Sequence, residues 1–132
     1  VLLTAGAAPA LAQDTASTPK KAPDSTEAAA PAAAPKGVSA ELIAQGDKIF
    51  HGAGLCYACH GSNAQGAVGP NLTDAEWIHS KGTLEEITAQ IMKGVPKEES
   101  KSGIVMPPKG GSSISDDEVK AVAAYVYSLS HK

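Results

Sequence analysis

Apolar residues recur at helical spacing in three stretches of the chain, and each stretch predicts an amphipathic helix. The first follows Ser39, a residue type suited to cap a helix N-terminus, with Glu41 in the first turn. Its apolar face comprises Leu42, Ile43, Gly46, Ile49 and Phe50. Glycine within a helix costs about 1 kcal/mol relative to alanine, so Gly46 predicts a point where another helix crosses closely. The helix is expected to end near His51-Gly52.

Two further helices are predicted by capping boxes, in which a Ser or Thr precedes a Glu by three residues. Thr83 and Glu86 open the first, which is expected to end at Gly94, before Pro96. Its apolar positions are Leu84, Ile87 and Ile91. Ser115 and Glu118 open the second, which is expected to run to the C-terminus. Its apolar positions are Val119, Val122, Ala123, Val126 and Leu129.

A fourth, short helix is predicted from the capping box of Thr73 and Glu76, and it would carry Trp77 and Ile78. Residues 61–72 and 97–113 are rich in glycine, proline and small polar residues and are expected to be loops. No alternating pattern or hairpin turn pair predicts a strand. The sequence therefore predicts an all-α domain over residues 39–132.

The N-terminal part of the chain has a different character. Residues 1–12 form an apolar, alanine-rich run that ends in Ala10-Leu11-Ala12, a small-x-small pattern typical of a signal-peptide cleavage site. We interpret this run as a signal peptide remnant that is cleaved; an uncleaved anchor is the alternative. Residues 13–38 are rich in alanine and proline and are expected to form a disordered tail or tether. The predicted location is periplasmic, with the protein exported and either soluble or loosely tethered.

The composition of the chain argues against one class of protein and favours another. The formal net charge is −3 and the chain contains no arginine, whereas a nucleic-acid-binding protein normally presents a basic face. Aromatic residues make up only 4% of the chain. A core this poor in aromatic side chains favours a domain that packs around a buried cofactor.

The stretch Cys56-Tyr57-Ala58-Cys59-His60 has the C-x-x-C-H spacing of covalent c-type haem attachment. Each thiol can add to one haem vinyl group, and the adjacent His60 is then the proximal iron ligand. A structural zinc site would need a second ligand pair, and Cys56 and Cys59 are the only cysteines. A thioredoxin-like pair would need a βαβ pattern, which is not found; a chance match with a plain cysteine pair is the remaining alternative.

The sixth iron ligand has several candidates: Met106, Met92, His79, His51 and His131, or an open site. Met106 is favoured because it lies in a Gly/Pro-rich loop, where a rigid backbone could present its thioether. Met92 follows Ile91 in a predicted amphipathic helix, where a methionine usually fills the core. His51 is too close to the motif to reach the opposite haem face. Ligation by His60 and Met106 would raise the reduction potential and favour electron transfer.

The whole pattern resembles a class I cytochrome c. Gly46 and Phe50 resemble the N-terminal helix of that family, and residues 122–126 resemble its C-terminal helix, whose aromatic residue packs across the glycine. Gly69-Pro70-Asn71-Leu72 resembles the segment whose proline carbonyl accepts a hydrogen bond from the proximal imidazole, and Met106-Pro107 resembles the methionine loop. The resemblance implies a cytochrome c fold of about four helices around one covalently bound haem c, with Pro70 orienting His60.

A narrower resemblance is to the haem-c subunit of microaerobic terminal oxidases. It rests on Asn71-Leu72-Thr73-Asp74-x-x-Trp77 and on residues 124–130, and it adds Trp77 to the residues expected to contact the cofactor. Those subunits commonly carry two haem domains and a membrane anchor, whereas this chain has one C-x-x-C-H motif. A small exported relative fits this difference.

We therefore expect a monomeric electron-transfer protein, not an enzyme, that carries single electrons to or from redox proteins such as a terminal oxidase or a dehydrogenase. No nucleic-acid partner is expected, and membrane association only through the tether. One alternative is a haem-based ligand-binding or peroxidase-like protein with a labile sixth site. Another is a domain docked in a larger complex, where it relays electrons.

Overall fold

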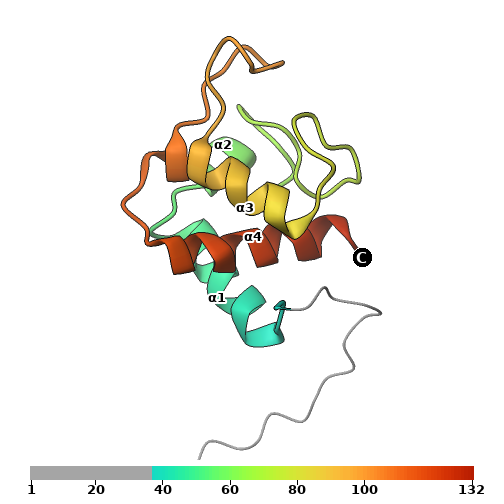
Figure 1. Cartoon of the computed structure of the whole chain (residues 1–132), viewed down its shortest axis with the longest axis vertical. Coiled ribbons are helices and arrows are strands. Elements are labelled where there is room, and N and C mark those ends of the chain that lie inside the picture. The colour runs from blue at the N-terminus through green and yellow to red at the C-terminus, as the bar shows by residue number, and fades with distance from the viewer. Residues whose placement is uncertain (1–36) are drawn as a thin grey trace, which may run out of the picture.

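The computed structural model describes residues 37–132; the predicted signal remnant (1–12) and nearly all of the predicted tail (13–38) lie outside the described residues. Figure 1 shows the helices: α1 (Ala40–His51), α2 (Tyr57–His60), α3 (Leu84–Lys93), the 3₁₀ turn η1 (Pro108–Gly111) and α4 (Asp116–Ser130). Over residues 37–132 the single β-type pairing is one isolated antiparallel bridge between Val95 and Met106. The prediction of an all-α domain is confirmed.

Helix α4 is the central element, since it packs on α1 and on α3 (Figure 1). The crossing of α1 and α4 occurs at Gly46, as predicted. A Cβ atom at Gly46 would collide with the carbonyl oxygen of Ala121 and lie 2.8 Å from the Cβ of Tyr125. Beside this crossing the fully buried ring of Phe50 meets the ring of Tyr125 edge-on, with centroids 5.4 Å apart. The sequence thus tolerates a helix-weakening glycine because only glycine allows the two backbones to approach.

The helix ends largely follow the predicted capping. The Ser39 hydroxyl accepts a hydrogen bond from the Leu42 amide, and Ser115 and Glu118 form a complete capping box. The box at Thr83 is only half formed. The Thr83 hydroxyl accepts from the Glu86 amide. The Glu86 carboxylate, however, accepts at 2.8 Å from the Lys81 amide, two residues before the N-cap, and not from the Thr83 amide. Gly94, in the left-handed region with φ +73°, ends α3 as expected.

The prediction of a short helix at residues 73–78 is wrong, because this segment forms bends and irregular backbone. Asn71 Oδ1 accepts hydrogen bonds from both the amide and the hydroxyl of Thr73, at 2.8 and 2.7 Å, and Asp74 Oδ1 accepts from the Glu76 amide at 3.1 Å. These short-range bonds satisfy backbone amides outside a helix, the usual way in which Asn and Asp compete with helical structure. Conversely, the single turn η1 appears within the expected loop 97–113, and α2 forms within the C-x-x-C-H motif, where no element was predicted.

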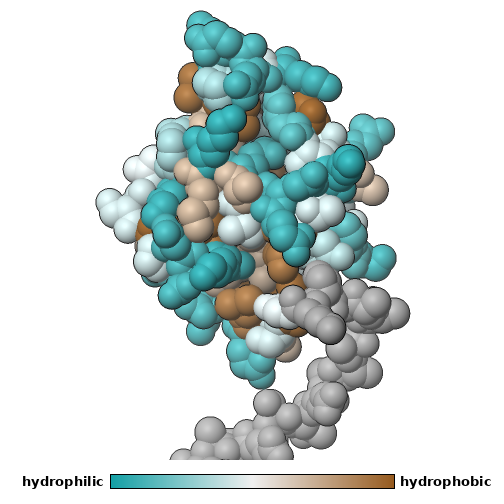
Figure 2. All heavy atoms as spheres, viewed as in Figure 1, coloured by the Kyte–Doolittle hydropathy of each residue, from teal (hydrophilic) through white to brown (hydrophobic). Residues whose placement is uncertain are grey.

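The core gathers apolar residues of all three long helices: Ile49, Phe50, Ile87, Ile91, Val119, Val122 and Val126. Figure 2 shows that the face in view is mainly hydrophilic, with apolar side chains in small separate patches. Between residues 37 and 132, no helix combines the length and the apolar character needed to cross a bilayer.

Candidate cofactor site

A cavity lies between the helices and the two long loops. Its apolar wall is supplied by Phe50 of α1, Ile87 and Ile91 of α3, and Val122 and Val126 of α4. The α2 turn and the loops supply the residues with cofactor chemistry: Cys56, Cys59, His60, Pro70, Trp77, His79 and Met106. About 1260 Å³ free of protein atoms, part of it open to solvent, lies in this cavity. The mainly apolar wall of this space suits a large apolar cofactor such as a porphyrin.

His60 is the one buried polar or charged side chain in residues 37–132, with 8% exposure. Its Nδ1 lies 2.9 Å from the carbonyl oxygen of Pro70. A carbonyl can only accept, so Nδ1 carries the proton and the lone pair of Nε2 is left available to a metal. The hydrogen bond implied by the cytochrome c resemblance is therefore present, whereas the role of His60 as an iron ligand stays a prediction.

The protonation state of His60 suits ligation as well. Burial lowers the pKa of the His60 imidazole, and the hydrogen bond to Pro70 partly opposes this shift. Gly69 lets the chain lie directly against the ring, since a Cβ there would lie 3.0 Å from His60 Cε1. The imidazole is thus held neutral and in one orientation, as second-shell contacts do for metal-binding histidines.

The two cysteines share the cavity wall with His60, because α2 spans most of the motif in a single turn. Cys56 is half-buried and Cys59 is exposed. Burial raises the pKa of the Cys56 thiol to about 11, and its S–H donates to the Gly54 carbonyl at 3.4 Å. Both cysteines line the cavity that would hold the porphyrin.

Met106 reaches the same cavity from a segment distant in sequence. Its amide donates to the Val95 carbonyl at 2.9 Å, and its carbonyl accepts from the Val95 amide at 2.8 Å. Gly94 permits this approach, because a Cβ there would collide with the Met106 carbonyl and lie 2.7 Å from the Pro108 nitrogen. The backbone of Met106 is therefore fixed to the end of α3, while its half-buried side chain lines the cavity.

The other candidates for the sixth ligand divide into two groups. His79 also lines the cavity, although it is exposed. Met92, His51 and His131 do not line it: Met92 lies in a shallow hollow on the outer side of α3, and His131 stacks on Tyr127. His51 is bonded to Ser62 and Asp47. Of the side chains on the sequence-derived list, Met106 and His79 therefore line the cavity, and the choice between Met106, His79 and an open site stays a prediction.

Trp77, named from the narrower resemblance, is half-buried and lines the cavity, with its indole packed against Gly82. Two contributors were not foreseen. In the sequence Gly69 is visible only as part of the Gly69-Pro70-Asn71-Leu72 motif, and its place beside Pro70 is the signal for close packing. Val95 was missed because a one-residue bridge leaves no periodic pattern; a β-branched residue directly after the helix-ending Gly94 was the available signal.

The chain is similar in sequence and in fold to known proteins. Residues 41–126 match the family model described as cytochrome C oxidase, cbb3-type, subunit III. The chain is 40% identical over 91 residues to the cbb3-type cytochrome c oxidase subunit CcoP of Rubrivivax gelatinosus, which covers 68% of this chain and 27% of that subunit. The chain thus spans only about a quarter of the length of that relative.

Two smaller relatives are also similar. Cytochrome c6 of Cladophora glomerata is 35% identical over 94 residues, which is 68% of this chain and 91% of that protein. Among solved structures, cytochrome CL of the methylotroph Methylophaga aminisulfidivorans aligns with a TM-score of 0.55 at 26% identity, over 70% of this chain and 55% of that one. The cytochrome c fold expected from the sequence is therefore shown.

Proposed function

The chain belongs to the c-type cytochrome family of cbb3-type oxidase subunit III, and from this membership we propose that it is a periplasmic one-electron carrier whose iron is ligated by His60 and Met106. A c-type cytochrome domain carries covalently bound haem c and transfers electrons through it. The haem supplies the chemistry, because its iron cycles between the ferrous and ferric states. The polypeptide supplies attachment, ligand orientation and a dry environment.

The observation that carries the proposal is the meeting of Cys56, Cys59, His60 and Met106 on one apolar cavity. Cys56 and Cys59 would attach the porphyrin through thioether bonds. Burial favours the neutral form of His60, the hydrogen bond to Pro70 leaves Nε2 free, and Val95 holds the Met106 backbone in place. A filled sixth position leaves no room for a substrate, so this ligand set favours electron transfer over catalysis.

We propose a redox protein, such as a terminal oxidase or a dehydrogenase, as the partner of the monomeric chain. Its relatives are named as subunits of an oxidase. Four apolar residues that line the cavity are 39–50% exposed: Leu55, Ile78, Ile104 and Val105. Such a rim lets a partner approach the cavity closely, as transient electron-transfer contacts require.

The test compares visible spectra of the purified ferric and ferrous protein with those of Met106→Ala and of the matched control His79→Ala. We expect a low-spin wild type, a high-spin ferric Met106→Ala variant, and a control indistinguishable from wild type. If His79→Ala changes the spin state and Met106→Ala does not, the ligand assignment is wrong. A high-spin wild type would instead support the ligand-binding or peroxidase-like alternative.

A further inference from the structure

The turn that follows Met106 contains a lysine in an unfavourable backbone conformation. Lys109 lies in the left-handed region with φ +55°, where residues other than glycine are uncommon. Neighbouring hydrogen bonds hold it there. The Lys109 carbonyl accepts from the Ser112 amide at 3.1 Å and from the Ser112 hydroxyl at 2.6 Å, and the Gly110 amide donates to the Pro107 carbonyl at 3.0 Å. The turn is therefore a defined structure whose formation directs the Lys109 side chain.

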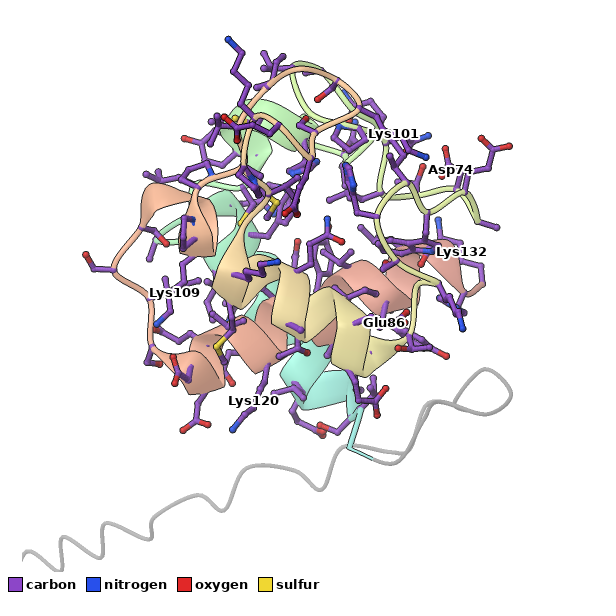
Figure 3. The ribbon with its side chains drawn as sticks, turned by 45° about the horizontal axis from the view of Figure 1, so that its top comes forward. Asp74, Glu86, Lys101, Lys109, Lys120 and Lys132 are labelled. Atoms are coloured by element: carbon purple, nitrogen blue, oxygen red, sulfur yellow. The ribbon has the colours of Figure 1, made fainter. Side chains whose placement is uncertain are left out.

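The Lys109 side chain ties this turn to the beginning of α4. Its Nζ donates to the backbone carbonyl of Ile114 at 3.0 Å and to Asp116 Oδ1 at 2.8 Å. Ile114 is buried and immediately precedes the N-cap of α4, and Asp116 is the first residue of that helix. Figure 3 shows Lys109 beside the connection between η1 and α4. The Lys109 side chain is 29% exposed and that of Asp116 is 68% exposed, so water competes less at the lysine than at the carboxylate.

The opposite end of the same short segment is fixed to a different helix. Met106 is bridged to Val95, which lies directly after α3. Directly after Lys109, Gly110 lies against the segment that leads into Cys56, since a Cβ there would lie 3.0 Å from the Gly54 carbonyl oxygen. The segment 106–110 thus has two anchors, one at the end of α3 and one at the start of α4.

We propose that Lys109 is a positioning residue that holds the Met106 segment against the cavity, through its bonds to Ile114 and Asp116. This inference rests on the proposed ligation of iron by Met106. Loss of the lysine would leave the Val95 bridge as the one hydrogen-bonded link between the segment and another element of the described chain. The segment would then open more often, and Met106 would leave the iron more often, while the ligand set itself would stay the same.

The chain offers a matched control on the same helix. Lys120 forms an ion pair with Asp117, also at 2.8 Å, but its side chain is 59% exposed and the pair lies within α4. Figure 3 shows Lys120 pointing outward from the helix. Lys120→Met removes the same charge and a pair of the same length as Lys109→Met, without touching the Met106 segment.

The experiment measures the rate at which imidazole binds to the ferric protein, a rate limited by departure of the internal ligand, and hydrogen exchange at the Met106 amide. For Lys109→Met we expect imidazole to bind about tenfold faster than to wild type, because a hydrogen bond to a charged group contributes about that factor. We also expect faster hydrogen exchange at the Met106 amide. Asp116→Asn, which keeps the bond to Ile114, should give an intermediate rate. Lys120→Met should match wild type.

Two outcomes would overturn the inference at different levels. If Lys109→Met and Lys120→Met give equal imidazole rates and equal Met106 exchange, Lys109 does not position the segment, although Met106 can still be the ligand. If the wild-type ferric protein lacks the long-wavelength charge-transfer band of a thioether ligand, the ligation by Met106 fails, and the inference that depends on it fails too.

Discussion

Replacing Gly46 by alanine tests the helix crossing on which the domain is built. The added methyl group would collide with the backbone carbonyl of Ala121 and approach Tyr125 Cβ to 2.8 Å. A backbone carbonyl in the middle of α4 cannot rotate away as a flexible side chain can, so the two helices would have to separate. Because α1 and α4 form the largest helix contact of the domain, this separation would loosen the packing around Phe50.

The expected loss follows from two opposing effects. Overpacking a core costs typically about 1–3 kcal/mol, and a collision with backbone belongs at the upper end of that range. Alanine is the better helix former by about 1 kcal/mol. The net prediction for Gly46→Ala is a loss of about 2 kcal/mol in the free energy of unfolding, or roughly 8–16 °C in Tm for a domain of this size.

The assay is urea unfolding of the haem-loaded protein followed by far-UV circular dichroism. The control is Ala44→Gly at an exposed position of the same helix, which should lose about 1 kcal/mol through helix propensity alone. If propensity were the only effect at residue 46 as well, Gly46→Ala would be more stable than wild type. A stability equal to or above that of wild type would therefore refute the close crossing.

Two further predictions concern the capping of α4 and the ionisation of His51. Ser115→Ala removes the hydroxyl of the capping box and should lower the free energy of unfolding by about 1 kcal/mol. The control Ser113→Ala, at an exposed neighbouring position, should change it by less than about 0.5 kcal/mol. Equal losses for the two variants would contradict the capping role of Ser115. Nε2 of His51 lies 2.6 Å from the Ser62 carbonyl oxygen, and Nδ1 lies 2.9 Å from both the carbonyl and the carboxylate oxygen of Asp47. The hydrogen bond to Ser62 is the largest cause that raises the pKa of His51, and the bond to the Asp47 carbonyl is the next. Only the protonated ring donates from both nitrogens, so the stabilising effect of His51 should be complete below its unfolded pKa of about 6.5 and be lost as pH rises through the higher folded value. In unfolding curves between about pH 5.5 and pH 8.5, wild type should lose stability relative to His51→Gln as pH rises; a difference that is constant with pH would contradict this.

The long helices could be predicted because their signals are local. Each combines a capping residue with an apolar face. The crossing at Gly46 could be predicted because glycine is unfavourable within a helix and here lies on the apolar face. The segment after Asn71 was mispredicted for an equally local reason. A capping box and a pair of Asx-type turns share the same residue types, and here the side chains of Asn71 and Asp74 bond to amides two residues ahead.

The candidate site was predictable where its residues are contiguous and less so where they converge. Cys56, Cys59 and His60 lie within five residues, and their spacing alone predicted the cofactor. The Val95–Met106 bridge and the left-handed Lys109 depend on how α3 and α4 place the ends of a loop. Since these contacts join residues distant in sequence, no periodic or capping pattern encodes them.

The claim that His60 and Met106 hold the iron of a one-electron carrier is tested most directly by voltammetry of the purified protein on an electrode. We predict one reversible wave with the slope of a single electron, a lower potential for Met106→Ala because thioether ligation raises the potential, and no added current when hydrogen peroxide is supplied. A peroxide-dependent catalytic current in wild type, or a potential that Met106→Ala leaves unchanged, would contradict the claim.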